Sequence, residues 1–391
     1  MKKNLFLIVC LLLVAIYLKG QNTKLPKTLD LIKLTKTKET KNTTDIFELV
    51  KFVPLETQTE CITKVSTIVV TQDNIFIFSN AQGCVLKFDR EGKFIGKIGR
   101  RGKGPGEFVS PFNLTLFRYY NNNIYLFDVV SYKIIKYSID GQKFQDIPLE
   151  GKQGFIYSDM LNENCFFVTN SNPFINKNQS GTFSELLSYG TKGNLTFKFP
   201  LHSNSKNSNN LMLPSIFYHF NNTVYYKSPY CDTVFRILGP TKRATAYTLS
   251  PGNKRFESNG GPMSLKVPPG AIVIYGLHET QRYLLIDYIF NGNKRAVYNK
   301  LTGTFFQIQS LKEENGKNID GCAFLWSEPL MLEESNVPSE YISYIEPWVL
   351  KGLDINKLDI QSAYIKSELI KLQKKIDEND NPIIVIMREK K

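Results

Sequence analysis

The sequence of 391 residues contains only three histidines, His202, His219 and His278, and six cysteines. No HxxxH or HExxH arrangement and no CxxC pair occurs, so no zinc-ligand spacing is present. A GxSxG nucleophile elbow and the sialidase pattern SxDxGxTW are also absent. Linear motifs therefore assign no catalytic residue, no metal ligand and no cofactor. A catalytic pair of carboxylates from distant segments remains an open alternative, because such a pair has no characteristic spacing in the sequence.

Long apolar runs are also lacking, apart from Leu5–Tyr17 behind the basic start Met1-Lys2-Lys3. This run is shorter than the roughly 20 residues that a spanning helix needs. Its layout is typical of a signal peptide, which we expect over residues 1–20. We therefore expect an extracytoplasmic protein, in the periplasm or at the cell surface, without a transmembrane helix. Lipoprotein anchoring through Cys10 is disfavoured, because only five apolar residues precede that cysteine.

Five cysteines follow the signal peptide, namely Cys61, Cys84, Cys165, Cys231 and Cys322. Export permits disulfides, but an odd number leaves at least one thiol unpaired within a monomer. We expect buried thiols that act as small apolar side chains.

Acidic residues are outnumbered, 36 against 49 Lys and Arg, which gives a formal net charge of +13. Much of the excess lies in a Lys/Thr-rich segment, residues 21–44, that we expect to be a solvated linker. A basic tail could also meet acidic polysaccharide or an anionic envelope surface. Export argues against nucleic acid, so the expected partners are a glycan, a peptide or an envelope protein. The oligomeric state is left open.

Two stretches near the N-terminus repeat with an offset of 49 residues. Three landmarks keep this offset, namely Asn74 and Asn123, Phe88 and Tyr137, and Gly92 and Gly141. Apolar and polar residues alternate in short runs that end at Asn, Asp or Gly, which predicts half-buried antiparallel strands. Four such strands in roughly 40 to 50 residues are typical of a β-propeller blade.

Weaker copies follow around Leu187–Tyr189, Asn222–Ile237 and Tyr283–Tyr298, with a sixth around Cys322–Trp326. The span from Asp45 to about Ser339 accommodates six units of 49 residues. We therefore predict an all-β fold over residues 45–391, a six-bladed β-propeller of four-stranded antiparallel blades.

The C-terminal part departs from the repeat. Ser339–Gly352 and Ser362–Glu378 read as helices, which predicts a short helical segment over about 339–380. A final strand is expected over residues 382–388. Because an open ring would leave unpaired strand edges, we expect Ile46–Leu55 to pair with Pro382–Arg388.

The second repeat resembles a known family. Asp128, Lys133-Ile134 and Tyr137 stand where an NHL repeat has its Asp, its Arg-Ile and its closing aromatic residue, and Gly99–Phe108 resembles the glycine-rich loop between such blades. With Val53–Thr57 and Glu378–Pro382, the chain resembles the uncharacterised exported six-bladed β-propeller proteins of Gram-negative gut bacteria. The resemblance implies a fold and a compartment, and it brings no activity.

The glycine-rich loop is no P-loop, because Pro105-Gly106 follows Gly104 where Lys-Ser/Thr would be needed. Its glycines are better explained by positive φ in a connection between blades. The alternative is that Arg100, Arg101 and Lys103 bind an anion such as a uronate or a sulfate.

Three further residues are candidates for ligand binding. Tyr132, Tyr230 and Asp232 are expected in equivalent loops of two blades on one face. The aromatic rings could stack on sugars there, and the alternative is that they pack between blades. Asp128 is expected to cap the turn after its strand rather than to act in catalysis.

The sequence thus favours a binding or interaction propeller for a glycan, a peptide or a partner protein. The alternative is an enzyme, a lactonase-like hydrolase or a polysaccharide lyase, with its site at the mouth of the central channel. Acidic residues or histidines that converge on the channel would favour the enzyme.

Overall fold

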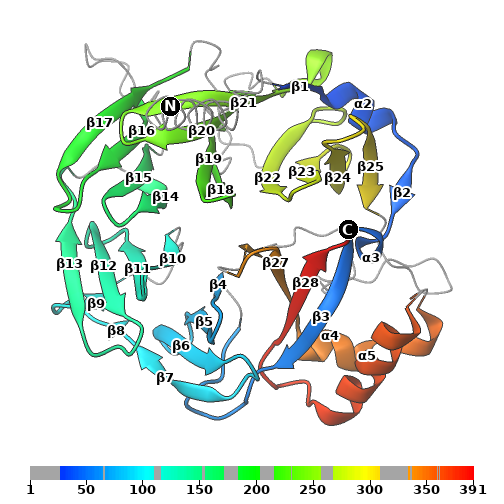
Figure 1. The fold of residues 1–391 in the computed structure, drawn as a ribbon, viewed down its shortest axis with the longest axis horizontal. Coiled ribbons are helices and arrows are strands. Elements are labelled where there is room, and N and C mark those ends of the chain that lie inside the picture. Colours follow the sequence, from blue (N-terminus) through cyan, green and yellow to red (C-terminus); the bar gives the residue numbers. More distant parts are fainter. Residues whose placement is uncertain are drawn as a thin grey trace, which may run out of the picture.

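The computed structural model describes residues 27–64, 67–109, 116–151, 155–170, 184–202, 215–229, 231–256, 267–308, 333–334, 337–358, 360 and 362–391. The expected signal peptide, with Cys10, and the expected repeat at Cys322–Trp326 lie outside them. Six small sheets surround a common axis, so the chain is a six-bladed β-propeller (Figure 1). The predicted all-β fold is confirmed.

Blades I–III are built from consecutive strands, of which the first is innermost and the last outermost. Blade I comprises β4 (Thr67–Val70), β5 (Asn74–Ser79), β6 (Cys84–Asp89) and β7 (Phe94–Ile98). Blade II comprises β10 (Phe117–Tyr120), β11 (Asn123–Asp128), β12 (Lys133–Ser138) and β13 (Phe144–Pro148). Blade III comprises β14 (Phe155–Asn162), β15 (Cys165–Asn170), β16 (Ser184–Tyr189) and β17 (Leu195–Pro200).

Blades IV–VI recruit strands from elsewhere in the chain. Blade IV comprises β18 (Ile216–Phe220), β19 (Thr223–Lys227), β20 (Thr233–Gly239), β21 (Lys242–Ser250) and β1 (Lys27–Asp30). Blade V comprises β22 (Val273–Glu279), β23 (Tyr283–Ile289), β24 (Asn293–Asn299), β25 (Phe305–Ile308) and β2 (Thr40–Lys41). Blade VI comprises β26 (Glu333–Glu334), β27 (Glu340–Ile345), β28 (Ile383–Glu389) and β3 (Phe47–Pro54).

The alternation in β5 shows why the repeat folds as a blade. Ile75 and Ile77 pack in a core shared with blade VI, whereas Phe76 and Phe78 pack in a core shared with blade II. Successive side chains of a strand point to opposite faces, so each blade can bury both of its faces against neighbours. Each fully buried apolar side chain contributes roughly 1.5–3 kcal/mol, which makes the ring itself the hydrophobic core.

Both ends of the chain close the ring, as predicted. The N-terminal strand β3 pairs antiparallel with the C-terminal strand β28, from Ile383 opposite Pro54 to Glu389 opposite Phe47. Figure 1 shows these two strands side by side in blade VI. The sixth blade is therefore a composite of β26, β27, the C-terminal strand and the N-terminal strand.

A buried amide reinforces this closure just before β28. The Asn381 side chain, 1% exposed, accepts a hydrogen bond from the Thr63 amide at 2.7 Å. Its Nδ2 donates to the carbonyl oxygens of Glu56, at 2.7 Å, and Cys61, at 3.0 Å. One side chain thus satisfies three backbone groups of the segment that follows β3.

The segment expected to be a linker adds structure to the ring from Lys27 onward. β1 pairs parallel with β21 and β2 pairs parallel with β25, so each covers an outermost strand. The helix α2 (Leu31–Lys36) lies between them, and the helix α3 (Thr43–Ile46) leads into β3. This segment packs onto the ring because it has apolar residues among its lysines. Leu29, Leu31 and Leu34 are buried against blades IV and V.

The C-terminal helices differ partly from the prediction. The sequence predicts a helix over Ser339–Gly352, but the first half of this segment forms the strand β27, and only α4 (Pro347–Gly352) is helical. The segment forms a strand because it pairs with β28 over six residues. The second expected helix is present as α5 (Ala363–Lys375), and Ser362 caps it through the Ile365 amide. Both helices pack outside blade VI (Figure 1).

Among the described residues, Cys61, Cys84, Cys165 and Cys231 are free and buried, as expected of small apolar side chains. Burial raises the pKa of the Cys84 thiol to about 11. In this part of the chain no helix is both long and apolar enough to span a membrane.

The closure by Asn381 can be tested by Asn381→Ala. The substitution leaves three backbone groups without their partner, and each buried unsatisfied group costs about 1–3 kcal/mol. We expect the free energy of unfolding in urea to fall by about 3 kcal/mol. Asn379→Ala, in the exposed turn two residues earlier, is the matched control and should change it by less than about 0.5 kcal/mol. Equal effects of the two substitutions would contradict the role of Asn381.

Candidate functional site

A cavity of about 720 Å³, which we call the channel cavity, receives residues from all six blades. Its aromatic lining residues are Tyr119, Tyr120, Phe220 and Tyr341. Its amide-bearing lining residues are Asn162, Asn221, Asn222 and Gln281. Among the described residues that line it, Arg118 and His219 are the only basic groups, and none is Asp or Glu. The wall is therefore aromatic and amide-rich with one basic side.

The channel cavity lies at one particular face of the ring. Its residues cluster where the first strand of a blade turns into the second, around Tyr120, Asn162, Asn221–Asn222 and Gln281. We call this the inner-turn face. Because successive strands are antiparallel, the turns between second and third strands lie at the opposite face.

Two of these turns owe their shape to paired asparagines. Asn121 and Asn122 have φ of 47° and 57°, and Asn221 and Asn222 have φ of 48° and 56°. Two consecutive left-handed residues make the type I′ turn that matches the twist of a hairpin, and Asn tolerates this conformation. The tight turns bring the preceding residues, Tyr120 and Phe220, to the cavity wall.

Three blades bring Arg118, Asp159 and His219 together. Arg118 donates from Nε to Asp159 Oδ1 at 3.0 Å and from Nη2 to Oδ2 at 3.2 Å. His219 Nε2 lies 3.0 Å from both carboxylate oxygens. The Asp159 side chain is only 1% exposed, against 25% for Arg118 and 24% for His219. The carboxylate thus sits behind two nitrogen-bearing side chains that reach the cavity.

The charge of Asp159 is stabilised by these neighbours. Burial disfavours the ionised carboxylate, but Arg118 and His219 outweigh it and hold the pKa of Asp159 well below its usual range. One negative charge therefore orients two side chains of the wall at neutral pH. Among the described residues, no group of three or more His, Cys, Asp or Glu side chains could hold a metal ion.

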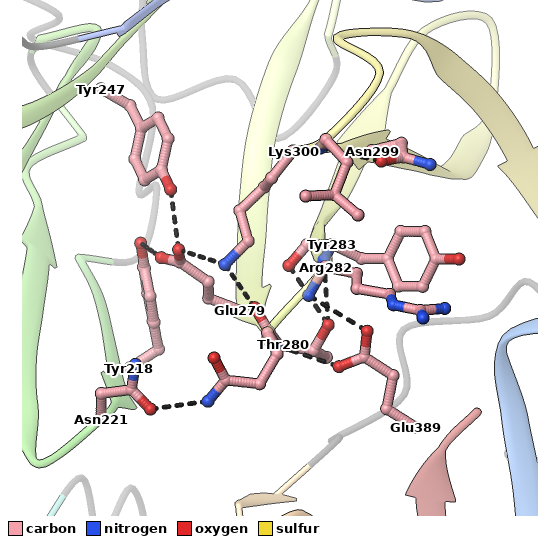
Figure 2. A network of polar contacts seen from close by, with 12 residues as sticks. Tyr218, Asn221, Tyr247, Glu279, Thr280, Arg282, Tyr283, Asn299, Lys300 and Glu389 are labelled. Carbon is pink, nitrogen blue, oxygen red and sulfur yellow. Dashed lines mark hydrogen bonds and ion pairs between the residues drawn. The ribbon is translucent and has the colours of Figure 1, made fainter. Parts of the chain in front are cut away.

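A second polar network lies between blades IV and V, beside the cavity (Figure 2). The buried Glu279 carboxylate accepts hydrogen bonds from Tyr218 at 3.1 Å, Tyr247 at 2.7 Å and Lys300 Nζ at 2.9 Å. Burial and the Glu279 charge raise the pKa of both tyrosines, so they stay donors. Lys300 Nζ also lies 4.2 Å from the ring centroid of Phe220, which lines the cavity.

The same network fixes the turn of blade V that reaches the cavity. The backbone amides of Gln281 and Arg282 each donate to the Glu389 carboxylate at 3.0 Å. The Gln281 side chain donates to Asn221 Oδ1 at 2.8 Å. The last residue of the closing strand β28 thus holds an inner turn that lines the cavity, and this turn is tied to blade IV.

The basic residues predicted to bind an anion lie elsewhere. Arg100 and Arg101 form β8 (Arg100–Arg101), which pairs with β9 (Glu107–Phe108) at the outer rim near β13 (Figure 1). Arg100 binds Glu107 at 2.6 Å, Arg101 donates to the Asn80 carbonyl at 3.0 Å, and Lys103 is exposed. None of them lines the channel cavity. Anion binding by Arg100, Arg101 and Lys103 stays a prediction.

Two of the four glycines of this loop have the positive φ that the sequence favoured. Gly99 and Gly106 have φ of 64° and 66°. A Cβ on Gly99 would lie 2.7 Å from the Tyr137 ring, and the Tyr137 hydroxyl donates to the Gly106 carbonyl at 2.7 Å. The loop is therefore fitted closely to blade II.

The remaining candidates do not come together at the cavity. Tyr132 is only 6% exposed and packs against Phe127, so its ring is not accessible for stacking on a sugar. Asp232 forms an ion pair with Arg255 near the start of β20, and Tyr230 lies outside the described residues. Asp128 is buried and accepts hydrogen bonds from the amides of Val109 and Val130, consistent with a role in the turn.

Sequence reasoning missed Arg118, Asp159 and His219, because they come from three blades and share no linear motif. One signal was available for the turns. An aromatic residue followed by two asparagines occurs at 120–122 and again at 220–222. This pattern marks inner turns with an aromatic side chain at the cavity wall.

Fold and cavity define a six-bladed β-propeller whose ring is closed by both ends of the chain. Residues 26–388 match the family described as Domain of unknown function (DUF4934), and the chain belongs to this family. No curated protein matches the sequence significantly.

Two solved structures are similar to this chain. One is described as a candidate exported protein of Bacteroides fragilis, with 18% identity over 94% of this chain and 99% of that chain and a TM-score of 0.63. The other is a member of the DUF4221 family from Bacteroides vulgatus, with 8% identity over 89% of this chain and 99% of that chain and a TM-score of 0.49. At this identity, the first likeness supports the fold alone.

The lowered pKa of Asp159 predicts a pH-dependent contribution to stability. A group whose pKa is depressed by folding stabilises the native state above its unfolded pKa, and that contribution is lost as the pH falls further. Asp159→Asn should therefore lower the free energy of unfolding by about 3 kcal/mol at pH 7, because it leaves Arg118 without its counter-charge. The difference from the native protein should shrink as the pH falls below about 4.

Urea unfolding between pH 7 and pH 3 measures this difference. Asp73→Asn, at an exposed carboxylate, is the control and should change stability little at any pH. A difference for Asp159→Asn that is independent of pH would contradict the assignment.

Proposed function

We propose that the protein is an exported binding propeller that holds a glycan in the channel cavity at its inner-turn face. The observation that carries the proposal is the lining of the cavity of about 720 Å³, which contains four aromatic and four amide side chains. Aromatic rings offer flat apolar faces to sugar rings, and amides both donate to and accept from hydroxyl groups. The volume lies within the range of roughly 300–1,000 Å³ that is usual for ligand sites.

The rigidity of the wall supports the same function. Tyr119 donates to Asn122 at 2.7 Å and Gln281 donates to Asn221 at 2.8 Å, so the turns are held before any ligand arrives. A preformed wall reduces the entropy that a ligand must overcome on binding. A peptide or a partner protein is the other expected class of ligand.

Export of the protein is part of the proposal. It is supported by the signal-peptide layout of residues 1–20 and by the structural likeness to a protein described as a candidate exported protein. The NHL-like character of blades I and II, and an origin in Gram-negative gut bacteria, remain predictions from the sequence resemblance.

Tyr120→Ala tests the location of the site. Tyr120 lines the cavity and is 36% exposed, so its loss should remove stacking area without opening the core. A thermal-shift screen of the native protein first identifies an oligosaccharide that binds. We expect the Tyr120→Ala variant to bind this oligosaccharide about tenfold more weakly than the native protein, which corresponds to about 1.4 kcal/mol. Calorimetric titration provides the measurement.

Tyr364→Ala provides the matched control, because this tyrosine is 59% exposed on α5, outside the ring. Its affinity should equal that of the native protein. Arg101→Ala should also bind normally, and a loss of affinity in that variant would place the site at the rim instead.

An enzyme is the second candidate, and one observation favours it. The buried Asp159 carboxylate orients His219 at the cavity wall, which is the arrangement of a base and its orienting acid. Paired carboxylates gain no support, since none line the cavity within the described part of the chain. If the protein is an enzyme, the native protein should turn over lactones or polyuronates, and the His219→Gln variant should not. Absence of turnover with both classes would leave binding as the function.

A further inference from the structure

We infer that the glycan held in the channel cavity is acidic and places a carboxylate beside Arg118 and His219. The inference rests on the proposed function, because it names the class of sugar that the same site takes. Stacking on aromatic rings and hydrogen bonds to amides give no role to Arg118 and His219, which also line the cavity.

The first step is the distribution of charge on the wall. Arg118 and His219 reach the cavity, and no acidic side chain lines it among the residues that the structure describes. Their common partner Asp159 is only 1% exposed, so a ligand meets the nitrogen-bearing side chains and not the carboxylate. Because Asp159 balances the charge of Arg118, this position offers oriented nitrogen-bearing side chains, and a ligand carboxylate would meet these and not the Asp159 carboxylate.

The second step is that the other buried carboxylate beside the cavity, Glu279, is also paired. The Glu279 carboxylate is buried and bonded to Lys300 at 2.9 Å, so that pair is neutral as a whole. The chain as a whole carries a formal net charge of +13, which favours the approach of anions over cations. The net charge of the chain therefore does not oppose the approach of an anionic ligand.

The third step is geometry. Asp159 binds Arg118 through two parallel hydrogen bonds, which fixes the plane of the guanidinium group. His219 is held by the same carboxylate from a neighbouring blade. A neutral sugar would gain little from two pre-oriented basic groups, whereas a uronate combines a carboxylate with a ring for the aromatic wall and hydroxyls for the amides.

Trigalacturonate and the neutral galactose trimer with the same linkages are the probes, since they differ in the carboxylates. In calorimetric titrations at low salt, we expect the native protein to bind trigalacturonate at least tenfold more tightly. The preference should weaken as salt is added, because screening acts on the charged contact.

Three variants locate the preference. His219→Gln and Arg118→Lys should each lower the affinity for trigalacturonate about fivefold or more, with little effect on the neutral trimer. Arg118→Lys keeps the charge beside buried Asp159, so it guards against misfolding. Lys33→Gln removes one exposed charge at the outer rim and should leave both affinities unchanged.

The outcomes separate the inference from the function on which it rests. Equal binding of both trimers, or tighter binding of the neutral one, would overturn the acidic ligand and leave a glycan-binding cavity. Binding of neither trimer would overturn the acidic ligand and count against the glycan as well. A preference for trigalacturonate that persists in both cavity variants would show that the carboxylate binds elsewhere.

Discussion

The pairing of β3 with β28 is the interaction on which the rest of the structure depends. Six blades can bury both faces of every sheet only if the ring is closed, and this pair closes it across more than 300 residues of sequence. Buried Glu340 adds ion pairs to Arg90 of blade I at 2.9 Å and to Arg388 of β28 at 3.4 Å. Glu389 connects the closing strand to the cavity, because its carboxylate accepts hydrogen bonds from the backbone amides of Gln281 and Arg282.

The channel cavity follows from this closure and from local chemistry. All six blades contribute to its wall, so its shape exists only in the complete ring. Asn pairs supply turns that bring Tyr120 and Phe220 to the wall, and one buried carboxylate orients side chains from two other blades. The contacts that keep the wall rigid are therefore largely contacts between blades.

Much of the fold could be predicted because it depends on local patterns. The 49-residue repeat and the alternation at Ile75–Phe78 defined the first two blades, and two apolar terminal strands indicated the closure. The strand β27 was missed because pairing with β28, and not local propensity, decides its structure. The residues of the cavity wall were missed because Arg118, Asp159 and His219 meet only through the ring. The conspicuous Arg100-Arg101 pair lies at the rim instead.

Hydrogen exchange of the protein with and without trigalacturonate is the most direct test of the central claim, that the inner-turn face holds the ligand. The account predicts slower exchange of the backbone amides around 119–122, 219–222 and 281, with no change around 100–103. Slower exchange confined to the rim loop, or no change at the inner turns, would contradict it.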